Sequence, residues 1–133
     1  MEHQHHNRIN GEKLLNGQLL GSDRLLRSAN GRYYLAMQKD GNLVIYNGDN
    51  HIAQNSIWAS NTWNKGPAPH RAIIQADGNF VLYDASNHPQ WASGTYQVGH
   101  PGHYVVMQND GNLVVFDGHG QPTWASNTVR NDA

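Results

Sequence analysis

The sequence predicts an all-β domain in which three similar sheets pack around a common axis. The chain of 133 residues carries one ten-residue pattern three times, over residues 37–46, 74–83 and 107–116. Each copy is followed by Trp-Ala-Ser, beginning at Trp58, Trp91 and Trp124, which are spaced 33 residues apart. Within each copy apolar residues alternate with polar ones, as in strands, and no segment shows a convincing helical repeat.

Each copy is predicted to form a β-hairpin, because Asp-Gly flanked by alternating apolar residues is the strongest short-range hairpin signal. After the turn, Leu43 and Ile45 fall on one face of the strand, and Asn42, Val44 and Tyr46 fall on the other. The face of Leu43 is apolar in all copies and is predicted to face the core. Its members are Leu35, Met37, Leu43 and Ile45, then Ala72, Ile74, Phe80 and Leu82, then Val105, Met107, Leu113 and Val115.

A unit of 33 residues has room for about four short strands with their turns. Propeller blades and β-trefoil units are longer, so three separate sheets forming a prism fit best. The first two copies are four residues further apart than the last two, and the polar stretch 47–55 is predicted to be a lengthened surface loop. Residues 1–12 precede the pattern and are predicted to be a mobile tail, which leaves residues 13–133 as a single domain of three repeats.

Composition argues against several classes of function. Nine Lys and Arg against ten Asp and Glu give a net charge of −1, with no basic stripe for nucleic acid. There is no cysteine, which excludes disulfides and thiol chemistry. No apolar run is long enough for membrane insertion. The N-terminus lacks the pattern of a signal peptide, so we expect a cytoplasmic protein or one exported by a route without a signal.

The polar face of the hairpin varies less among the copies than the core face does. Core positions change among Met, Ile, Leu, Phe and Val, as packing permits, whereas Gln, Asp, Asn and Val recur. Turn chemistry explains Asp-Gly-Asn, but it explains neither the Gln before it nor the aromatic residue after it. We therefore expect one binding site per copy. The candidate residues are Gln38, Asp40, Asn42, Val44 and Tyr46; Gln75, Asp77, Asn79, Val81 and Tyr83; and Gln108, Asp110, Asn112, Val114 and Phe116.

These residue types suit a neutral sugar, whose hydroxyls both donate and accept hydrogen bonds. Gln and Asn supply paired donors and acceptors, and Asp supplies a charge-assisted acceptor. A site built on such groups discriminates against ligands that leave them unpaired.

The pattern Gln-x-Asp-x-Asn-x-Val-x-Tyr, present three times and followed by Trp-Ala-Ser, resembles the bulb-type mannose-binding lectins of monocots, the snowdrop lectin family. The resemblance covers about residues 13–133. It implies a β-prism II fold of three four-stranded antiparallel sheets with pseudo-threefold symmetry and central tryptophans. It also implies one shallow mannose site per motif, no metal or cofactor, and a role in defence or glycan recognition.

In the family Asp and Asn read the axial 2-hydroxyl of mannose, Gln the 3-hydroxyl and Tyr the 4-hydroxyl, and Val packs on the sugar carbons. The resemblance also implies a homodimer that exchanges C-terminal strands, here residues 123–129, and agglutinates cells. Two positions depart from the pattern. Gly41 stands where family members commonly carry a disulfide-bonded cysteine, and Phe116 lacks the tyrosine hydroxyl.

Other readings are weaker. Glycoside hydrolysis needs two carboxylates facing one bond, and each motif holds one; Asp84 and Asp117 follow two copies, but Asn47 follows the other. One carboxylate per site is also too few for calcium. The nine histidines show no repeated position and indicate no designed metal site, and Trp63 belongs to no repeat. The alternative function is a β-prism scaffold that binds protein partners with little or no sugar binding.

Overall fold

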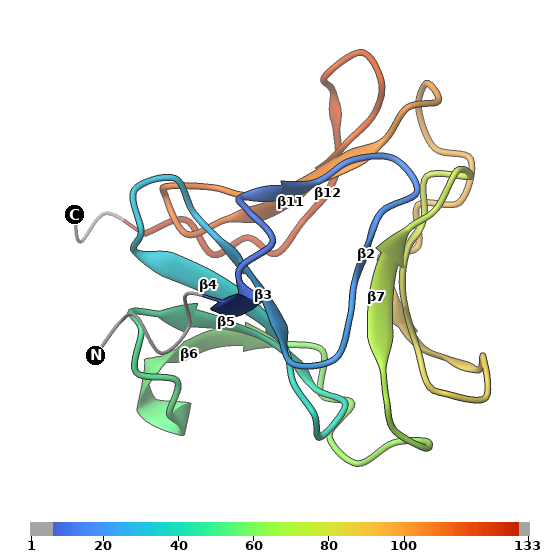
Figure 1. The fold of residues 1–133 in the computed structure, drawn as a ribbon. Coiled ribbons are helices and arrows are strands. Elements are labelled where there is room, and N and C mark those ends of the chain that lie inside the picture. Colours follow the sequence, from blue (N-terminus) through green and yellow to red (C-terminus); the bar gives the residue numbers. More distant parts are fainter. Residues whose placement is uncertain (1–6, 131–133) are drawn as a thin grey trace.

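The computed structural model describes residues 7–130, which form three four-stranded antiparallel sheets. Figure 1 shows the sheets as the sides of a triangular prism. Sheet one contains β3 (Arg24–Arg27), β4 (Tyr33–Met37), β5 (Leu43–Asn47) and β6 (Ser56–Ala59); sheet two contains β2 (Leu19–Leu20), β7 (Arg71–Ile74), β8 (Phe80–Tyr83) and β9 (Pro89–Ala92); sheet three contains β1 (Lys13–Leu14), β10 (Tyr104–Met107), β11 (Leu113–Phe116) and β12 (Pro122–Ala125). The predicted all-β prism is confirmed.

The fourth strand of each sheet does not come from the repeat. Each repeat supplies three consecutive strands, and the outer strands β1, β2 and β3 all come from residues 13–27. Lys13 pairs with Val106 in sheet three, and Leu19 pairs with Ile73 in sheet two. The expectation of about four strands per repeat was therefore wrong by one strand. The N-terminal segment passes along all three sheets in turn and completes each of them.

The predicted core face is buried in all three copies. The core contains the predicted apolar positions, together with Leu14, Leu20 and Leu26 from the three N-terminal strands. These three leucines occupy equivalent places, because each pairs with or lies beside the strand that precedes the motif turn. Burying a leucine side chain stabilises a fold by roughly 1.5–3 kcal/mol, so Leu14, Leu20 and Leu26 each help to anchor their short strand to the core.

The three repeated tryptophans meet where the sheets converge. The ring centroids of Trp58, Trp91 and Trp124 lie 5.3–5.7 Å apart. The ring planes are inclined by 71–76°, which is the edge-to-face arrangement that aromatic pairs favour. The tryptophans therefore belong to the centre of the prism, as the resemblance implied.

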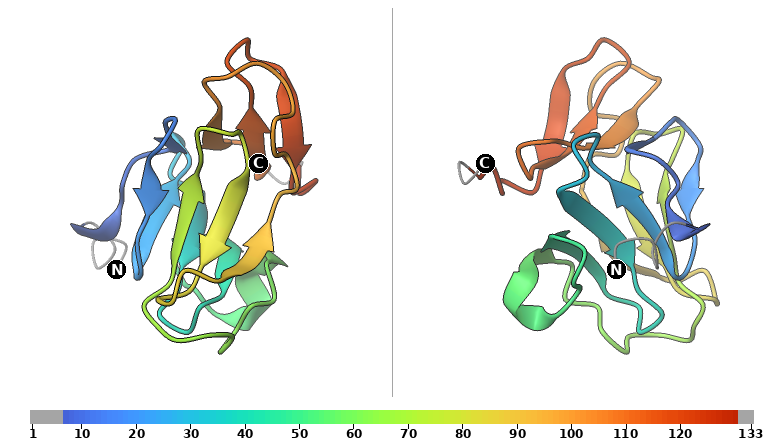
Figure 2. Two further views of the ribbon diagram at one scale, coloured as in Figure 1. Left: turned by 90° about the vertical axis from the view of Figure 1, so that its right-hand side faces the viewer. Right: turned by 60° about the vertical axis from the view of Figure 1, so that its left-hand side comes forward.

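The predicted long loop is present between β5 and β6. It contains one 3-10 turn, η2 (Ala53–Asn55), which stands out as the short green coil in Figure 2. Its residue His51 folds back over sheet one and stacks on Tyr46, with ring centroids 4.6 Å apart and planes 6° apart. Sheet one thus has a covered outer face, where Leu25, Tyr34 and Val44 are buried in a second apolar cluster.

Residues 7–12, which precede β1, belong to the described part of the structure. Ile9 forms a parallel bridge with Leu25, and the N–H of Asn10 donates to the carbonyl of Leu25 at 2.7 Å. Arg8 pairs with Asp23. Residues 8–11 therefore pack on sheet one, and the carbonyl of Glu12 accepts the N–H of Met107 in sheet three at 2.9 Å. The mobile tail predicted over residues 1–12 stays a prediction for residues 1–6, which lie outside the described part.

At the other end, β12 completes the sheet of its own chain. Val115 pairs with Trp124 and Val114 with Ala125, so β12 is the outer strand of sheet three. Between residues 7 and 130, no helix is long and apolar enough to cross a membrane.

Candidate functional site

Each motif begins in a tight turn between two strands. In sheet one the N–H of Gln38 donates to the carbonyl of Asn42, and the N–H of Gly41 donates to the carbonyl of Gln38, both at 3.0 Å. Gly41 has a φ of 88°, which glycine adopts without strain. A Cβ at this position would lie 2.7 Å from Cε1 of His70. The His70 ring therefore fills the space that a larger side chain at position 41 would need.

The motif asparagine holds the turn against the segment that follows the strand of the tryptophan. In sheet one, Oδ1 of Asn42 accepts hydrogen bonds from the Ser60 hydroxyl at 3.3 Å and the Thr62 N–H at 3.2 Å. The Thr62 hydroxyl donates to the carbonyl of Gly41 at 2.6 Å. Because Oδ1 is used inside the protein, the amide NH2 of Asn42 is the part of the side chain left for a ligand.

The same arrangement occurs in the other two copies. The equivalent residues are Asn79, Ser93 and Thr95 with Gly78, and Asn112, Ser126 and Thr128 with Gly111. The sequence showed the Ser and Thr as part of the repeated marker, but it did not reveal that they bind the motif asparagine.

The motif aspartate fixes its own turn and keeps an oxygen for other contacts. Oδ1 of Asp40 accepts the N–H of Asn42 at 2.9 Å, and Asp77 does the same for Asn79 at 2.9 Å. In sheet two the other oxygen of Asp77 accepts a hydrogen bond from Nε2 of Gln75 at 3.0 Å. The carboxylate is thus oriented before any ligand arrives.

Glutamine and tyrosine of the motif are joined across the hairpin. The Tyr46 hydroxyl donates to Oε1 of Gln38 at 3.3 Å, and the Tyr83 hydroxyl to Oε1 of Gln75 at 2.6 Å. Burial, and secondly the charge of Asp40, raise the pKa of Tyr46. Its hydroxyl therefore remains protonated and able to donate.

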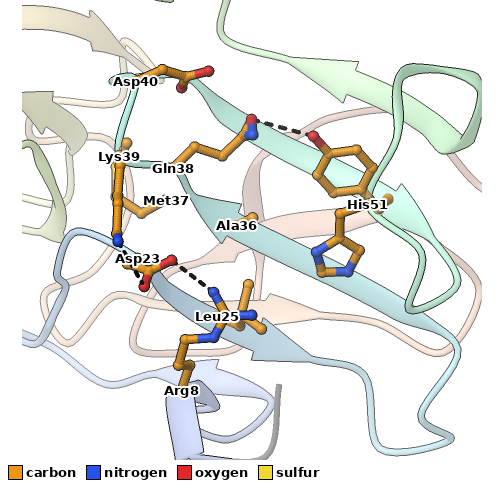
Figure 3. Close-up of a pocket in the computed structure, with 10 residues that line it drawn as sticks. Arg8, Asp23, Leu25, Ala36, Met37, Gln38, Lys39, Asp40 and His51 are labelled. Atoms are coloured by element: carbon orange, nitrogen blue, oxygen red, sulfur yellow. Dashed lines mark hydrogen bonds and ion pairs between the residues drawn. The ribbon is translucent and has the colours of Figure 1, made fainter. Parts of the chain in front are cut away.

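A cleft lies over the first motif and is shown in Figure 3. It has a volume of about 480 Å³ and is bordered by the motif residues Gln38, Asp40 and Tyr46. Its walls include Arg8, Asp23 and His51 from outside the motif, and Lys39 at a variable position of the motif. Asp23 binds Nη1 of Arg8 at 2.7 Å and lies 3.8 Å from Nζ of Lys39. These wall residues could not be predicted from the sequence, because no repeated signal marks them.

The three sites differ in what lies against the motif aromatic ring. His51 stacks on Tyr46 in sheet one, whereas the guanidinium of Arg71 lies 4.9 Å from the Tyr83 ring centre in sheet two. In sheet three, Phe116 stacks on Tyr104 with centroids 5.3 Å apart. A second cleft borders the third motif at Gln108 and Asp110, with Glu12 on its wall.

Asp84 and Asp117 are turn residues at the opposite ends of their strands from the motif aspartates. Both are buried. The N–H of His100, followed by that of Gln121, lowers the pKa of Asp117 to about 2. The N–H of His88 is the main cause that lowers the pKa of Asp84. Each carboxylate is held by backbone N–H groups, and Asp84 also accepts a hydrogen bond from Nε2 of Gln90 at 2.9 Å. Each lies at the end of its strand away from the motif aspartate.

Two predictions from the sequence need correction, one about the histidines and one about Trp63. His70 and His103 do occupy a repeated position: both are buried, and each Nε2 lies 2.6 Å from a carbonyl oxygen, of Lys65 and Val98. Their spacing of 33 residues was the available signal, obscured because Tyr33 stands at the equivalent place in copy one. Within the described part of the chain, no cluster of three or more His, Asp or Glu residues could hold a metal ion.

Trp63 also has repeated counterparts. It directly follows Thr62, just as Tyr96 follows Thr95 and Val129 follows Thr128. All three side chains are exposed, by 62%, 61% and 56%. The substitution of Tyr and Val for Trp concealed this equivalence in the sequence.

No family model and no curated protein matches the chain. Solved structures do match over most of its length. A monomeric monocot mannose-binding lectin from Gastrodia elata is 36% identical, with a TM-score of 0.75 over 89% of this chain and 98% of the other. A Marasmius oreades lectin is 30% identical, with a TM-score of 0.78 over 90% and 94%. The mannose-specific agglutinin from snowdrop (Galanthus nivalis), complexed with methyl-α-D-mannoside, is 32% identical, with a TM-score of 0.69 over 88% and 96%.

Three antiparallel sheets around a common axis, each with the same polar motif at its hairpin turn, define a β-prism II lectin. Lectins bind carbohydrates and catalyse no reaction on them. The chain belongs to the monocot mannose-binding lectin family.

Proposed function

We propose that this chain binds mannose and mannose-rich glycans at its three motifs. The observation that carries the proposal is that each motif presents an oriented aspartate and the free amide of an asparagine beside one another, as at Asp77 and Asn79. An adjacent acceptor and donor suit a single sugar hydroxyl, which both donates and accepts. The snowdrop relative complexed with a mannoside supports mannose as the sugar.

The remaining motif residues supply the other contacts in this proposal. Gln75 and Tyr83 are already hydrogen-bonded to each other at 2.6 Å, so little side-chain ordering is needed when a sugar binds. Val81 is 3% exposed and would offer only a small apolar surface to the carbon atoms of the ring. In the third site Phe116 has no hydroxyl, and losing one hydrogen bond of roughly 0.5–1.5 kcal/mol lowers affinity by up to about tenfold.

Calorimetric titration with methyl-α-D-mannoside tests the proposal, with methyl-α-D-glucoside as the ligand control. Asp77→Asn removes the charged acceptor of site two and should reduce the number of binding sites by one. Asp84→Asn is the matched control: it makes the same chemical change at the other end of β8 (Phe80–Tyr83), at a position where copy one carries Asn47. This control should keep full mannoside binding.

The outcomes separate binding from folding. If Asp77→Asn binds as many mannoside molecules as the unchanged protein, the motif is not the sugar site. If it lowers the melting temperature by more than about 10 °C, the aspartate is structural instead. Phe116→Tyr should raise affinity at site three, and an unchanged titration would contradict the role given to the hydroxyl.

Multivalent binding is the second part of the proposal. An open monosaccharide site is expected to have a dissociation constant near 1 mM, about −4 kcal/mol, and several sites on one particle raise avidity by 10²–10⁴. Agglutination by a homodimer requires an assembly. Strand exchange through residues 123–129 would have to open the pairing of β12 (Pro122–Ala125) with its own β11 (Leu113–Phe116), and the Gastrodia relative is described as monomeric. Light scattering at micromolar concentration decides between monomer and dimer.

A further inference from the structure

The repeated exposed position formed by Trp63, Tyr96 and Val129 is held rigidly beside each motif. On one side, the hydroxyl of the preceding threonine donates to the carbonyl of the motif glycine at 2.6–2.7 Å. On the other side, the N–H of the following residue donates to the carbonyl of the motif aspartate, at 2.7 Å from Asn64 to Asp40 and 2.6 Å from Gln97 to Asp77. The exposed residue is therefore fixed between two hydrogen bonds to the motif turn.

In two of the three sites this position carries an aromatic residue, directly before the residue whose N–H binds the main-chain carbonyl of the motif aspartate. The N–H of Asn64 donates to the main-chain carbonyl of Asp40. Consecutive Cα atoms are about 3.8 Å apart, so the Cα of Trp63 lies about that far from the Cα of Asn64. Single exposed apolar residues are common on protein surfaces. Here, however, large rings occupy equivalent exposed places on two sheets, and each backbone is tied down on both sides.

A hollow beside site two lies in the same region. It has a volume of about 210 Å³ and is bordered by Asp77 and by Gln97, the residue after Tyr96. Gly99, Pro101 and His103 form the rest of its wall together with Ala76. The motif aspartate thus borders a concave surface that also includes the residue after Tyr96, and this surface offers room for a group attached to a sugar already bound at the motif.

We propose that Trp63 and Tyr96 form a second sugar subsite at sites one and two, where the ring stacks on the next residue of a glycan bound at the motif. This inference rests on the proposed function and extends it to oligosaccharides. A sugar ring has an apolar face of C–H groups that packs on an aromatic ring, and the motif next to it selects glycans rather than other apolar partners. Site three has Val129 at this position and lacks the stacking surface.

The repeat itself provides matched variants for the test. Trp63→Val and Tyr96→Val give sites one and two the residue of site three, and Val129→Trp makes the reverse change. Affinities for methyl-α-D-mannoside and for an α-linked mannobiose are measured by calorimetry. Each Val variant should leave mannoside affinity unchanged and lower mannobiose affinity at its site by roughly 2- to 10-fold. Val129→Trp should raise mannobiose affinity at site three.

Fluorescence gives an independent readout. Trp63 is exposed, whereas Trp58, Trp91 and Trp124 pack against the core, so iodide should quench mainly Trp63. Mannobiose should protect Trp63 from quenching, and methyl-α-D-mannoside should not.

Several results would overturn the inference. Equal losses of mannoside and mannobiose affinity in Trp63→Val would place the ring in the primary site. Unchanged mannobiose affinity would remove any role in sugar binding, and a change in light-scattering mass would assign the ring to a subunit interface. If the unchanged protein binds mannobiose no better than the mannoside, only this inference fails. If it binds neither sugar, the proposed function itself fails.

Discussion

Asn79 should carry two separable roles, one in folding and one in sugar binding. Its Oδ1 accepts hydrogen bonds from the Ser93 hydroxyl at 3.2 Å, the Gly94 N–H at 3.0 Å and the Thr95 N–H at 3.1 Å. Its amide NH2 is the group proposed to meet the sugar. Asn79→Ala removes both groups, whereas Asn79→Asp keeps the acceptor and replaces only the donor.

The cost of Asn79→Ala follows from the three donors that lose their acceptor. Gly94 is exposed, so water can replace the lost partner of its N–H. Ser93 keeps hydrogen bonds to the Phe80 N–H and the Thr95 hydroxyl. Thr95 is 4% exposed, and a buried N–H without a partner costs about 1–3 kcal/mol. We expect the free energy of unfolding to fall by about 2–3 kcal/mol in total.

Urea unfolding and calorimetric titration measure the two roles in the same variants. At roughly 2–8 °C per kcal/mol for a domain of this size, Asn79→Ala should lower the melting temperature by at least about 4 °C. Asn79→Asp should stay within about 1 kcal/mol of the unchanged protein and still lose mannoside binding at site two. Salt near 1 M, where the Debye length is about 3 Å, limits repulsion between the new carboxylate and Asp77.

Two results would refute this reasoning. An unchanged melting temperature in Asn79→Ala would mean that the hydrogen bonds of Oδ1 contribute no stability. Full mannoside binding by Asn79→Asp would mean that the amide NH2 does not contact the sugar.

Three further predictions concern the turn, the core and acid stability. Gly41→Ala should destabilise the fold by about 2–5 kcal/mol in urea unfolding, because it combines positive-φ strain with a contact against the His70 ring. Gly48→Ala is the control: its φ is 98° and the space around it is open, so it should cost only the strain, about 1–2 kcal/mol. Trp91→Ala should cost about 3 kcal/mol, because it removes edge contacts with both other central tryptophans; an unchanged urea midpoint would contradict a core role. The pKa of Asp117 is lowered from 3.8 to about 2, so its stabilising contribution is complete above the unfolded value and is lost as the pH falls from about 4 through 2. Urea titrations across that range should show a shallower pH dependence for Asp117→Asn, and an identical slope would count against the role of this carboxylate.

The sequence predicted features whose causes lie within one repeat. The Asp-Gly turn and the alternation of Leu43 and Ile45 are local signals, and both correctly identified the hairpin and its buried face. Features that depend on distant partners were missed. The two-residue strands at Lys13–Leu14 and Leu19–Leu20 have too few residues to show alternation, and their pairing partners lie far along the chain.

For the candidate site, too, only the features with a local or repeated signal could be predicted from the sequence. The motif could be read from its repetition, because three copies show which positions stay fixed. The walls of the cleft at site one could not, because Arg8 and His51 come from segments present only once. The repeated place of Trp63 was hidden because its two counterparts, Tyr96 and Val129, have different chemistry.

The N-terminal segment also sets the order in which the molecule can be completed during synthesis. β3 (Arg24–Arg27) pairs with the strand that follows it directly, so sheet one can close early. β1 (Lys13–Leu14) must wait for a partner about 90 residues later, which at cellular translation rates takes roughly 5–20 s. Distant pairings of this kind also slow folding. A nascent chain therefore holds an unpaired N-terminal edge until its last repeat leaves the ribosome, and the sheet completed by the first residues of the domain is the last one to form.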